Sequence, residues 1–200
     1  MIDVAQTVAK TQQIPISATV KKQRIRLSNA PLTEEEVARL LSSITEPRDH
    51  ALLLLGANSG MRVSEAVGLE RVNIDEQEWL VTIWDEKKDA YRKVLLPQAT
   101  VSALLRYYNS LPKKTHRVFE FSTKTAENVI QAWTLKVLGK KKSWHCLRHT
   151  YVTLNSIKGT PIPVVCSNTG DAPATILRHY TNIPPQIARK FVEENAVFKE

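Results

Sequence analysis

Cysteine is scarce in this 200-residue sequence, which has only Cys146 and Cys166. The two do not form a CxxC pattern, so the sequence predicts neither a disulfide framework nor a zinc knuckle, and reduced thiols are expected. Long apolar runs are lacking too. The longest, around Ala51 to Leu55, is far shorter than the roughly 18 residues of a membrane span. Residues 1–10 lack the pattern of a secretory signal. We therefore expect a cytoplasmic protein that spans no membrane.

Acidic residues are fewer than basic ones. The chain has 28 Lys and Arg against 20 Asp and Glu, which gives a formal net charge of +8 and a pI of about 9.5. A basic surface gains affinity for nucleic acid by releasing counterions, so polyanions are the first partners to consider. Charge alone does not separate DNA from RNA or from an anionic membrane.

The basic excess is visible at the start of the chain. Residues 1–30 show little helical periodicity and read as a basic arm or linker, with candidate nucleic-acid contacts at Lys21, Lys22, Arg24 and Arg26. Thr33 and Glu36 then form a capping box ahead of a helix. We therefore predict one folded domain over residues 31–200.

The periodicity predicts an α+β domain, mainly helical, with one small antiparallel β-hairpin. Residues 79–84 and 91–96 alternate in the manner of strands around a charged turn. Apolar residues recur at helical spacing elsewhere. The expected helices cover residues 33–44, 48–58, 63–69, 98–109, 125–138, 145–158, 163–169, 174–180 and 185–198. Lys140, Lys141 and Lys142 are expected in a basic loop.

Three short motifs carry polar chemistry. In the first, His145 and Arg148 share one face of a helix with His149, so a proton acceptor lies beside a phosphate-binding guanidinium. Taken alone, a His and an Arg at this spacing more often have a structural or surface role than a catalytic one. Metal binding by the two histidines would need further ligands, and none is evident. We expect no metal and no cofactor.

In the second motif, Gly60 ends a buried helix and places Arg62 at the start of the next one. Glu65, one turn later, can hold the Arg62 guanidinium, although an isolated surface pair of this kind is worth little. In the third, Gly170-Asp171 precedes Tyr180 by nine residues. A tyrosine there could simply pack a helix end.

Taken in order, the three motifs resemble the catalytic domain of the tyrosine recombinases, the phage integrase family, over residues 32–198. The family pattern TGLRxSE corresponds to Ser59-Gly-Met-Arg-Val-Ser-Glu65, and HxLRHT to His145-Cys-Leu-Arg-His-Thr150. The family's LGH corresponds to Thr169-Gly-Asp171 and its YT to Tyr180-Thr181.

The resemblance implies a site-specific DNA recombinase that works through a 3′-phosphotyrosyl intermediate. Tyr180 would be the nucleophile, and Arg62 and Arg148 would bind the non-bridging phosphate oxygens. His145 would take the tyrosine proton. His149 has a supporting, usually structural, part.

The family also places a lysine acid in the turn of the hairpin. Strand alternation favours Lys88 for this part, and the long turn leaves Lys87 open.

Asp171 departs from the family pattern, which has a histidine or tryptophan donor at this position. An ionised carboxylate beside a phosphate is repulsive. Asp171 therefore turns away, is protonated or marks a weakened enzyme. His179 or Asn168 would supply the missing donor.

The resemblance implies double-stranded DNA as the partner, a monomer in free solution and a homo-oligomer, a tetramer, on DNA. The family's N-terminal DNA-binding domain is not matched by residues 1–30, so weak, salt-sensitive binding through the arm and Lys140 to Lys142 is expected. Two alternatives stay open. One is a type IB topoisomerase-like activity, and the other is a catalytically weakened, integrase-like DNA-binding module with a regulatory role.

Overall fold

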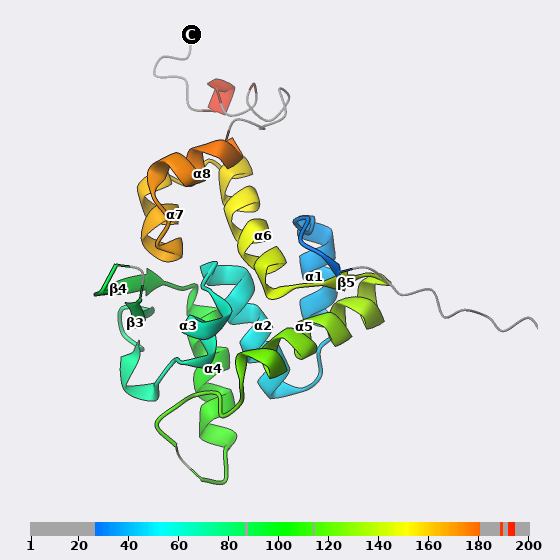
Figure 1. Cartoon of the computed structure of the whole chain (residues 1–200), viewed down its shortest axis with the longest axis vertical. Helices are drawn as coiled ribbons and strands as arrows, with labels where there is room; N and C mark the ends of the chain where they lie inside the picture. Colours follow the sequence, from blue (N-terminus) through cyan, green and yellow to red (C-terminus); the bar gives the residue numbers. More distant parts are fainter. Residues whose placement is uncertain (1–26, 87, 114, 181–188, 190–191, 195–200) are drawn as a thin grey trace, which may run out of the picture.

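The computed structural model of the chain describes residues 27–86, 88–113, 115–180, 189 and 192–194, and for His179 and Tyr180 the backbone alone. Helices dominate this part, as predicted, with two small sheets (Figure 1). In chain order the elements are β1 (Leu27–Ser28), α1 (Glu34–Ser42), α2 (Pro47–Ser59), α3 (Val63–Val67), η1 (Arg71–Asn73), β2 (Ile74–Asp75), β3 (Leu80–Asp85), β4 (Ala90–Leu95), α4 (Gln98–Ser110), α5 (Thr123–Leu138), β5 (Lys141–Lys142), α6 (Trp144–Ile157), α7 (Ile162–Thr169) and α8 (Pro173–Tyr180).

The start of α1 confirms the predicted capping box. The Thr33 hydroxyl accepts the Glu36 N–H at 3.2 Å, and the Glu36 carboxylate accepts the Thr33 N–H at 3.2 Å. Each side chain thus satisfies a backbone donor that the helix leaves without a partner. Leu40 on the inner face of α1 is 1% exposed and anchors the helix in the core.

The centre of the molecule is α2, which packs against α1, α3, α4, α5 and α6. Its apolar residues are buried on most faces, as expected of a central helix. Gly56 lets α6 approach closely, because a Cβ there would lie 2.8 Å from Leu147 and 2.9 Å from Trp144. The Trp144 indole donates to the Met61 carbonyl at 2.9 Å and fixes the start of α6 against the end of α2.

The predicted hairpin is confirmed as β3 and β4, which pair antiparallel from Leu80 with Leu95 to Asp85 with Ala90. A short additional strand, β2, pairs with β3 and completes a three-stranded sheet in the order β2-β3-β4. Val81 and Ile83 face the core, and Trp84 points outward, as alternation requires.

A second, smaller core lies between α6, α7 and α8. Tyr151, Val152, Val165 and Ile176 are buried together between the second half of α6, α7 and α8. These helices form the end of the molecule drawn in yellow to orange in Figure 1, and α7 also contacts β4 of the hairpin. The short helix that was expected to reach Leu69 ends at Val67, and the Leu69 carbonyl accepts the Val118 N–H at 2.9 Å.

Residues 27–30 and 140–142 differ from the prediction. Lys141 and Lys142 form β5, which pairs in parallel with β1, so this segment is a strand rather than a basic loop. The pairing also joins the end of the predicted arm to the domain. Lys21, Lys22, Arg24 and Arg26 lie outside the described residues, as does most of the helix expected over residues 185–198. In the described part, no helix is long and apolar enough to cross a membrane.

Candidate active site

Arg62 lies at the N-cap of α3, directly after the turn that ends α2. The Glu65 carboxylate accepts the Arg62 N–H at 2.7 Å through Oε2 and the guanidinium at 3.0 Å through Oε1. The side chain of Glu65 is 6% exposed, whereas that of Arg62 is 34% exposed. Glu65 therefore holds Arg62 from the protein side, as predicted, and leaves part of the guanidinium open to solvent.

Arg148 is more deeply set, with 7% of its side chain exposed. Its guanidinium donates to the Gly60 carbonyl through Nη1 and to the Thr169 carbonyl through Nη2, both at 2.7 Å. These carbonyls belong to the C-terminal ends of α2 and α7, where helix carbonyls lack an intrahelical partner. Arg148 thus ties together the two helix ends that flank the site.

Gly60 makes this arrangement possible. Its φ of 64° lies in the left-handed region, which turns the chain sharply after α2. A Cβ at this position would lie 2.7 Å from the Tyr151 ring and 3.1 Å from Thr169. Only glycine therefore brings the Gly60 carbonyl to Arg148 without a clash.

Asp171 points toward the two arginines. One carboxylate oxygen, Oδ1, lies 2.7 Å from Nη2 of Arg148 and 3.7 Å from Nη2 of Arg62. The Asp171 N–H donates to the Thr169 hydroxyl at 3.2 Å. The Asp171 side chain therefore faces the arginine pair. The three possibilities that the sequence leaves open concern Asp171 beside a phosphate, and they stay predictions.

The structure adds two charged residues to the site that the sequence interpretation missed. Asp85 and Arg92 lie on the inner face of the hairpin, where the side chain of Asp85 is 2% exposed and that of Arg92 is 11% exposed. Arg92 donates to Glu65 at 2.8 Å, and Asp85 lies 3.7 Å from Arg62. The signal was available, because alternation puts both residues on the same face as Val81 and Ile83.

Asn168 corrects another expectation. Its amide group donates to the Leu95 carbonyl and the Tyr151 hydroxyl, both at 2.9 Å, and accepts the Leu95 N–H at 3.0 Å. One amide hydrogen therefore holds β4 against α7, and the other is used on Tyr151 of α6. Asn168 has no donor left for a phosphate, contrary to the suggestion from sequence.

His145 and His149 lie one turn apart on α6, with ring centroids 4.2 Å apart. His145 is exposed, and His149 is half-buried. The same helix carries Arg148, so an exposed imidazole and a buried guanidinium come from one rigid element. Within the described residues, no group of three or more His, Cys, Asp or Glu side chains is arranged to hold a metal ion.

Lys88 lies in the turn of the hairpin, where its N–H donates to the Asp85 carbonyl at 3.0 Å and its side chain is exposed. Burial raises the pKa of the Cys166 thiol on α7, Asp171 raises it further, and the charge of Lys88 opposes the shift. Both charged groups therefore lie close enough to Cys166 to affect its pKa. The alternative acid, Lys87, lies outside the described residues.

Tyr180 is the last residue of α8, which packs on α6 and α7 through the buried Ile176. The backbone of α8 thus starts two residues after Asp171 and runs to Tyr180. The side chains of His179 and Tyr180 lie outside the described part of the chain, so their predicted roles stay predictions.

The three lysines around β5 have different environments. Lys142 is 3% exposed, and its ammonium donates to the Ala30 carbonyl at 2.7 Å and the Ser28 hydroxyl at 3.3 Å. This burial corrects the DNA contact predicted for Lys142. Lys140 pairs with Glu36 at 2.5 Å, and this hydrogen bond lowers the pKa of the Glu36 carboxyl. Lys141 is half-buried.

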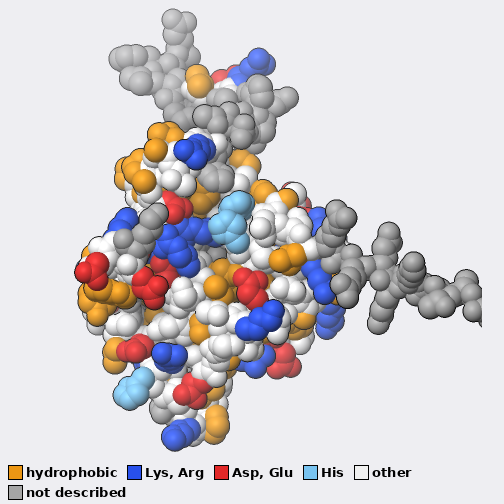
Figure 2. Space-filling model, viewed as in Figure 1, with side chains coloured by type: hydrophobic (Ala, Val, Ile, Leu, Met, Phe, Trp, Pro, Cys, Tyr) orange, Lys and Arg blue, Asp and Glu red, His pale blue; other side chains and the backbone are white. Residues whose placement is uncertain are grey.

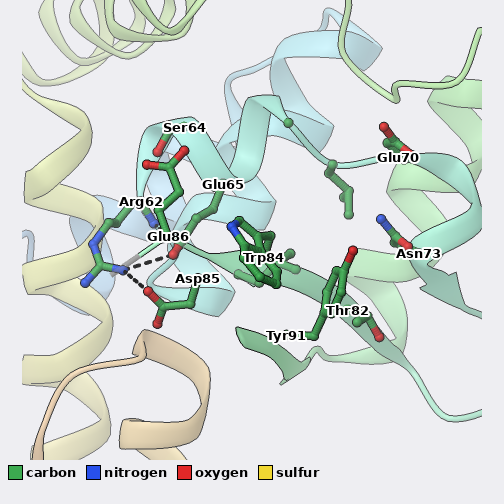
Figure 3. A pocket seen from close by; sticks show the side chains of 13 residues that line it. Arg62, Ser64, Glu65, Glu70, Asn73, Thr82, Trp84, Asp85, Glu86 and Tyr91 are labelled. Atoms are coloured by element: carbon green, nitrogen blue, oxygen red, sulfur yellow. Dashed lines mark hydrogen bonds and ion pairs between the residues drawn. The ribbon is translucent and has the colours of Figure 1, made fainter. Parts of the chain in front are cut away.

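A cavity of about 400 Å³ borders Arg62 on the hairpin side. Figure 3 shows Arg62 at one side of it, joined to Glu65 and Asp85, with the ring of Trp84 in the middle and that of Tyr91 beyond it. These rings meet edge to face at 5.0 Å. Figure 2 shows basic side chains gathered beside a histidine, with acidic side chains close to them. The site therefore combines anion-binding groups with their own counter-charges.

A family model matches this arrangement of motifs. The model of the phage integrase family covers residues 31–186, which is most of the chain. The chain belongs to the phage integrase family. This result confirms the resemblance inferred from the three motifs.

Among known members of the family, the chain is 30% identical over 185 residues to tyrosine recombinase XerC of Caldanaerobacter subterraneus subsp. tengcongensis. The match covers 84% of this chain and 52% of XerC. Tyrosine recombinase XerA of Pyrococcus furiosus is 26% identical over 173 residues, with 81% of this chain and 60% of XerA covered. The chain therefore spans roughly half to three fifths of the length of these curated relatives.

The solved structures agree on the fold. A crystal structure of XerA recombinase matches with a TM-score of 0.71 and 26% identity, covering 87% of this chain and 67% of that one. XerH recombinase, solved with its difH substrate in a pre-cleavage complex, matches with a TM-score of 0.67 and 21% identity. That match covers 87% of this chain and 55% of XerH. The predicted fold class is confirmed.

Proposed function

We propose that the chain is the catalytic part of a site-specific DNA recombinase that cleaves and rejoins strands through Tyr180. The observation that carries the proposal is the convergence of Arg62 and Arg148 on one carboxylate oxygen, at 3.7 and 2.7 Å. Two guanidiniums directed at a single oxygen form a binding site for an anion such as a phosphodiester. The helix that carries Tyr180 packs on both helices next to this site.

In the proposed reaction, the Tyr180 hydroxyl attacks a backbone phosphorus and loses its proton to His145. A bond forms between the phenolic oxygen and phosphorus, and the bond from phosphorus to the 5′-oxygen of the next nucleotide breaks. Lys88 gives a proton to the departing 5′-oxygen, with Lys87 as the alternative acid. Arg62 and Arg148 stabilise the charge that builds on the non-bridging oxygens.

The second step is the reverse of the first. A 5′-hydroxyl from a partner strand attacks the phosphotyrosyl bond, restores the phosphodiester and releases Tyr180. Because the covalent bond stores the energy of the phosphodiester, this scheme needs no nucleotide cofactor. Arg62 and Arg148 together form the phosphate clamp of this scheme. Glu65, bonded to both Arg62 and Arg92, supports the clamp. His149 supports His145 from one turn away.

The partner proposed for this chain is double-stranded DNA, with XerH in complex with its difH substrate as a structural parallel. The net charge of +8 supports DNA binding that weakens as salt rises. We propose a monomer in free solution, a tetramer on DNA and action in the cytoplasm. Light scattering with and without a bound duplex tests the proposed oligomeric states.

The proposal is tested with nicked suicide duplexes, in which the short cleaved fragment diffuses away and traps the covalent intermediate. A pool of random-sequence duplexes replaces the unknown site, and adducts that survive detergent are recovered. We expect adducts with the natural chain and none with Tyr180→Phe. The matched control is Tyr91→Phe, which alters an exposed tyrosine of the hairpin, 70% exposed, and should leave the yield unchanged.

The same experiment separates the alternatives. Relaxation of supercoiled plasmid without a specific site would favour a topoisomerase-like activity. DNA binding without any adduct would refute the recombinase and favour a DNA-binding module.

A further inference from the structure

The charges of the site balance within the chain itself. Three guanidiniums meet three carboxylates, and the residues involved are Arg62, Arg92, Arg148, Glu65, Asp85 and Asp171. Glu65 and Asp85 each contact Arg62 and Arg92, whereas Asp171 contacts Arg62 and Arg148. Asp171 is therefore the carboxylate that joins the two arginines expected to hold phosphate.

The three carboxylates differ in exposure. The side chains of Glu65 and Asp85 are 6% and 2% exposed, so they support the arginines from inside the protein. The side chain of Asp171 is 22% exposed and lies beside Arg62, which is 34% exposed. Asp171 thus lies on the open side of the arginine pair, which is the side from which a ligand arrives.

We infer that the Asp171 carboxylate is an internal occupant of the phosphate clamp, which a DNA phosphate has to displace before strand cleavage. The inference rests on the proposed function and adds a regulatory step to it. Carboxylate and phosphate oxygens accept the same hydrogen bonds from a guanidinium, so they compete for Arg148 and Arg62. Two anions on one pair of arginines would also repel each other.

The local backbone supports displacement of the side chain alone. Gly170, with φ of 74°, ends α7, and the Asp171 N–H is fixed on the Thr169 hydroxyl. The Asp171 main chain therefore keeps its place while the carboxylate rotates away from Arg148. Arg148 itself stays fixed through its bonds to the Gly60 and Thr169 carbonyls. The clamp is preformed and closed by one movable side chain.

The test compares the binding of inorganic phosphate by the natural chain and by Asp171→Asn, which keeps the shape of the side chain and removes its charge. Phosphate is titrated while NMR follows the Nε–H signals of the arginines. We expect Asp171→Asn to bind phosphate at least about tenfold more tightly, since it removes a charge-assisted competitor. The gain should vanish in the double variant Asp171→Asn with Arg148→Lys, because lysine lacks the planar fork.

The matched control is Glu78→Gln, which removes one exposed negative charge from the turn between β2 and β3, at a residue that does not line the cavity beside Arg62. The indole N–H signal of Trp144, bound to the Met61 carbonyl, reports that each variant is folded. Unchanged or weaker phosphate binding by folded Asp171→Asn, or an equal gain in Glu78→Gln, would overturn the inference. The titration needs no strand cleavage, so a chain that forms no DNA adduct refutes the proposed function without deciding the phosphate result.

Discussion

Arg148 and Asp171 lie 2.7 Å apart, with Nη2 of the guanidinium facing Oδ1 of the carboxylate. The same Nη2 also donates to the Thr169 carbonyl, two residues before Asp171. One guanidinium therefore holds both the end of α7 and the first residues of the segment that leads to α8. Positioning of the phosphate clamp and positioning of the helix that carries Tyr180 depend on the same side chain.

Arg148→Lys should keep the positive charge of the site and lose the planar set of N–H donors that a guanidinium offers. Lysine cannot reach both the Gly60 and the Thr169 carbonyls with planar donors, so we expect a loss of about 1 to 3 kcal/mol in unfolding free energy. Urea unfolding measures this loss. Arg62→Lys, at a side chain that is 34% exposed, should cost clearly less. Equal losses for the two variants would contradict the bridging role of Arg148.

Gly60→Ala and Gly139→Ala form a matched pair, because both glycines end a helix with positive φ, 64° and 69°. A Cβ at Gly139 meets nothing within 4 Å, so only the left-handed backbone costs free energy there, about 1 to 2 kcal/mol. A Cβ at Gly60 would also clash with Tyr151. The midpoint of thermal unfolding should be lower for Gly60→Ala than for Gly139→Ala. Only Gly60→Ala should weaken phosphate binding. The reverse order would exclude the proposed close approach.

Arg92→Met should lower the free energy of unfolding of the chain. It removes the bond to Glu65 and takes from the buried Asp85 one of its two neighbouring guanidiniums, at a cost of about 3 kcal/mol. The strand-cleavage yield should fall as well, because Glu65 holds Arg62. Lys93→Met, at an exposed position on the same strand, is the control. Similar unfolding midpoints for the two variants would show that Arg92 does not support the site.

Lys142→Met and Lys141→Met should separate stability from DNA binding. Lys142 is buried and donates to the Ser28 hydroxyl and the Ala30 carbonyl. Its loss should therefore lower the free energy of unfolding by about 1 to 2 kcal/mol and leave the salt dependence of DNA binding unchanged. Lys141→Met should be stable and, if Lys141 contacts a phosphate, lower the slope of log K against log salt by about 1. A lower slope for Lys142→Met would restore its predicted DNA contact.

The parts of the site that sequence could predict are local. Arg62 and Glu65 are three residues apart at the start of a helix, and this spacing brings their side chains together. The capping box of Thr33 and Glu36 follows from the same spacing. The hairpin follows from strict alternation. Asp85 and Arg92 could have been found in this way too, as charged residues at inward positions of a half-buried sheet.

The remaining features depend on tertiary contacts that no local pattern contains. The burial of Lys142 follows from a two-residue parallel pairing between β1 and β5, which is too short to leave a periodic signal. The use of Asn168 to join β4 and α7 depends on the packing of two elements far apart in sequence. The direction of Asp171 could not be chosen from sequence for the same reason, because its partners come from α3 and α6.

The central claim is tested most directly by locating the covalent bond to DNA. After nuclease treatment and trypsin digestion of a trapped adduct, the peptide of residues 179–189 contains Tyr180 as its only tyrosine. Tandem mass spectrometry should find a nucleotide remnant on Tyr180, attached through its 3′-phosphate. A remnant on any other residue, or a trapped adduct that persists in Tyr180→Phe, would contradict the account.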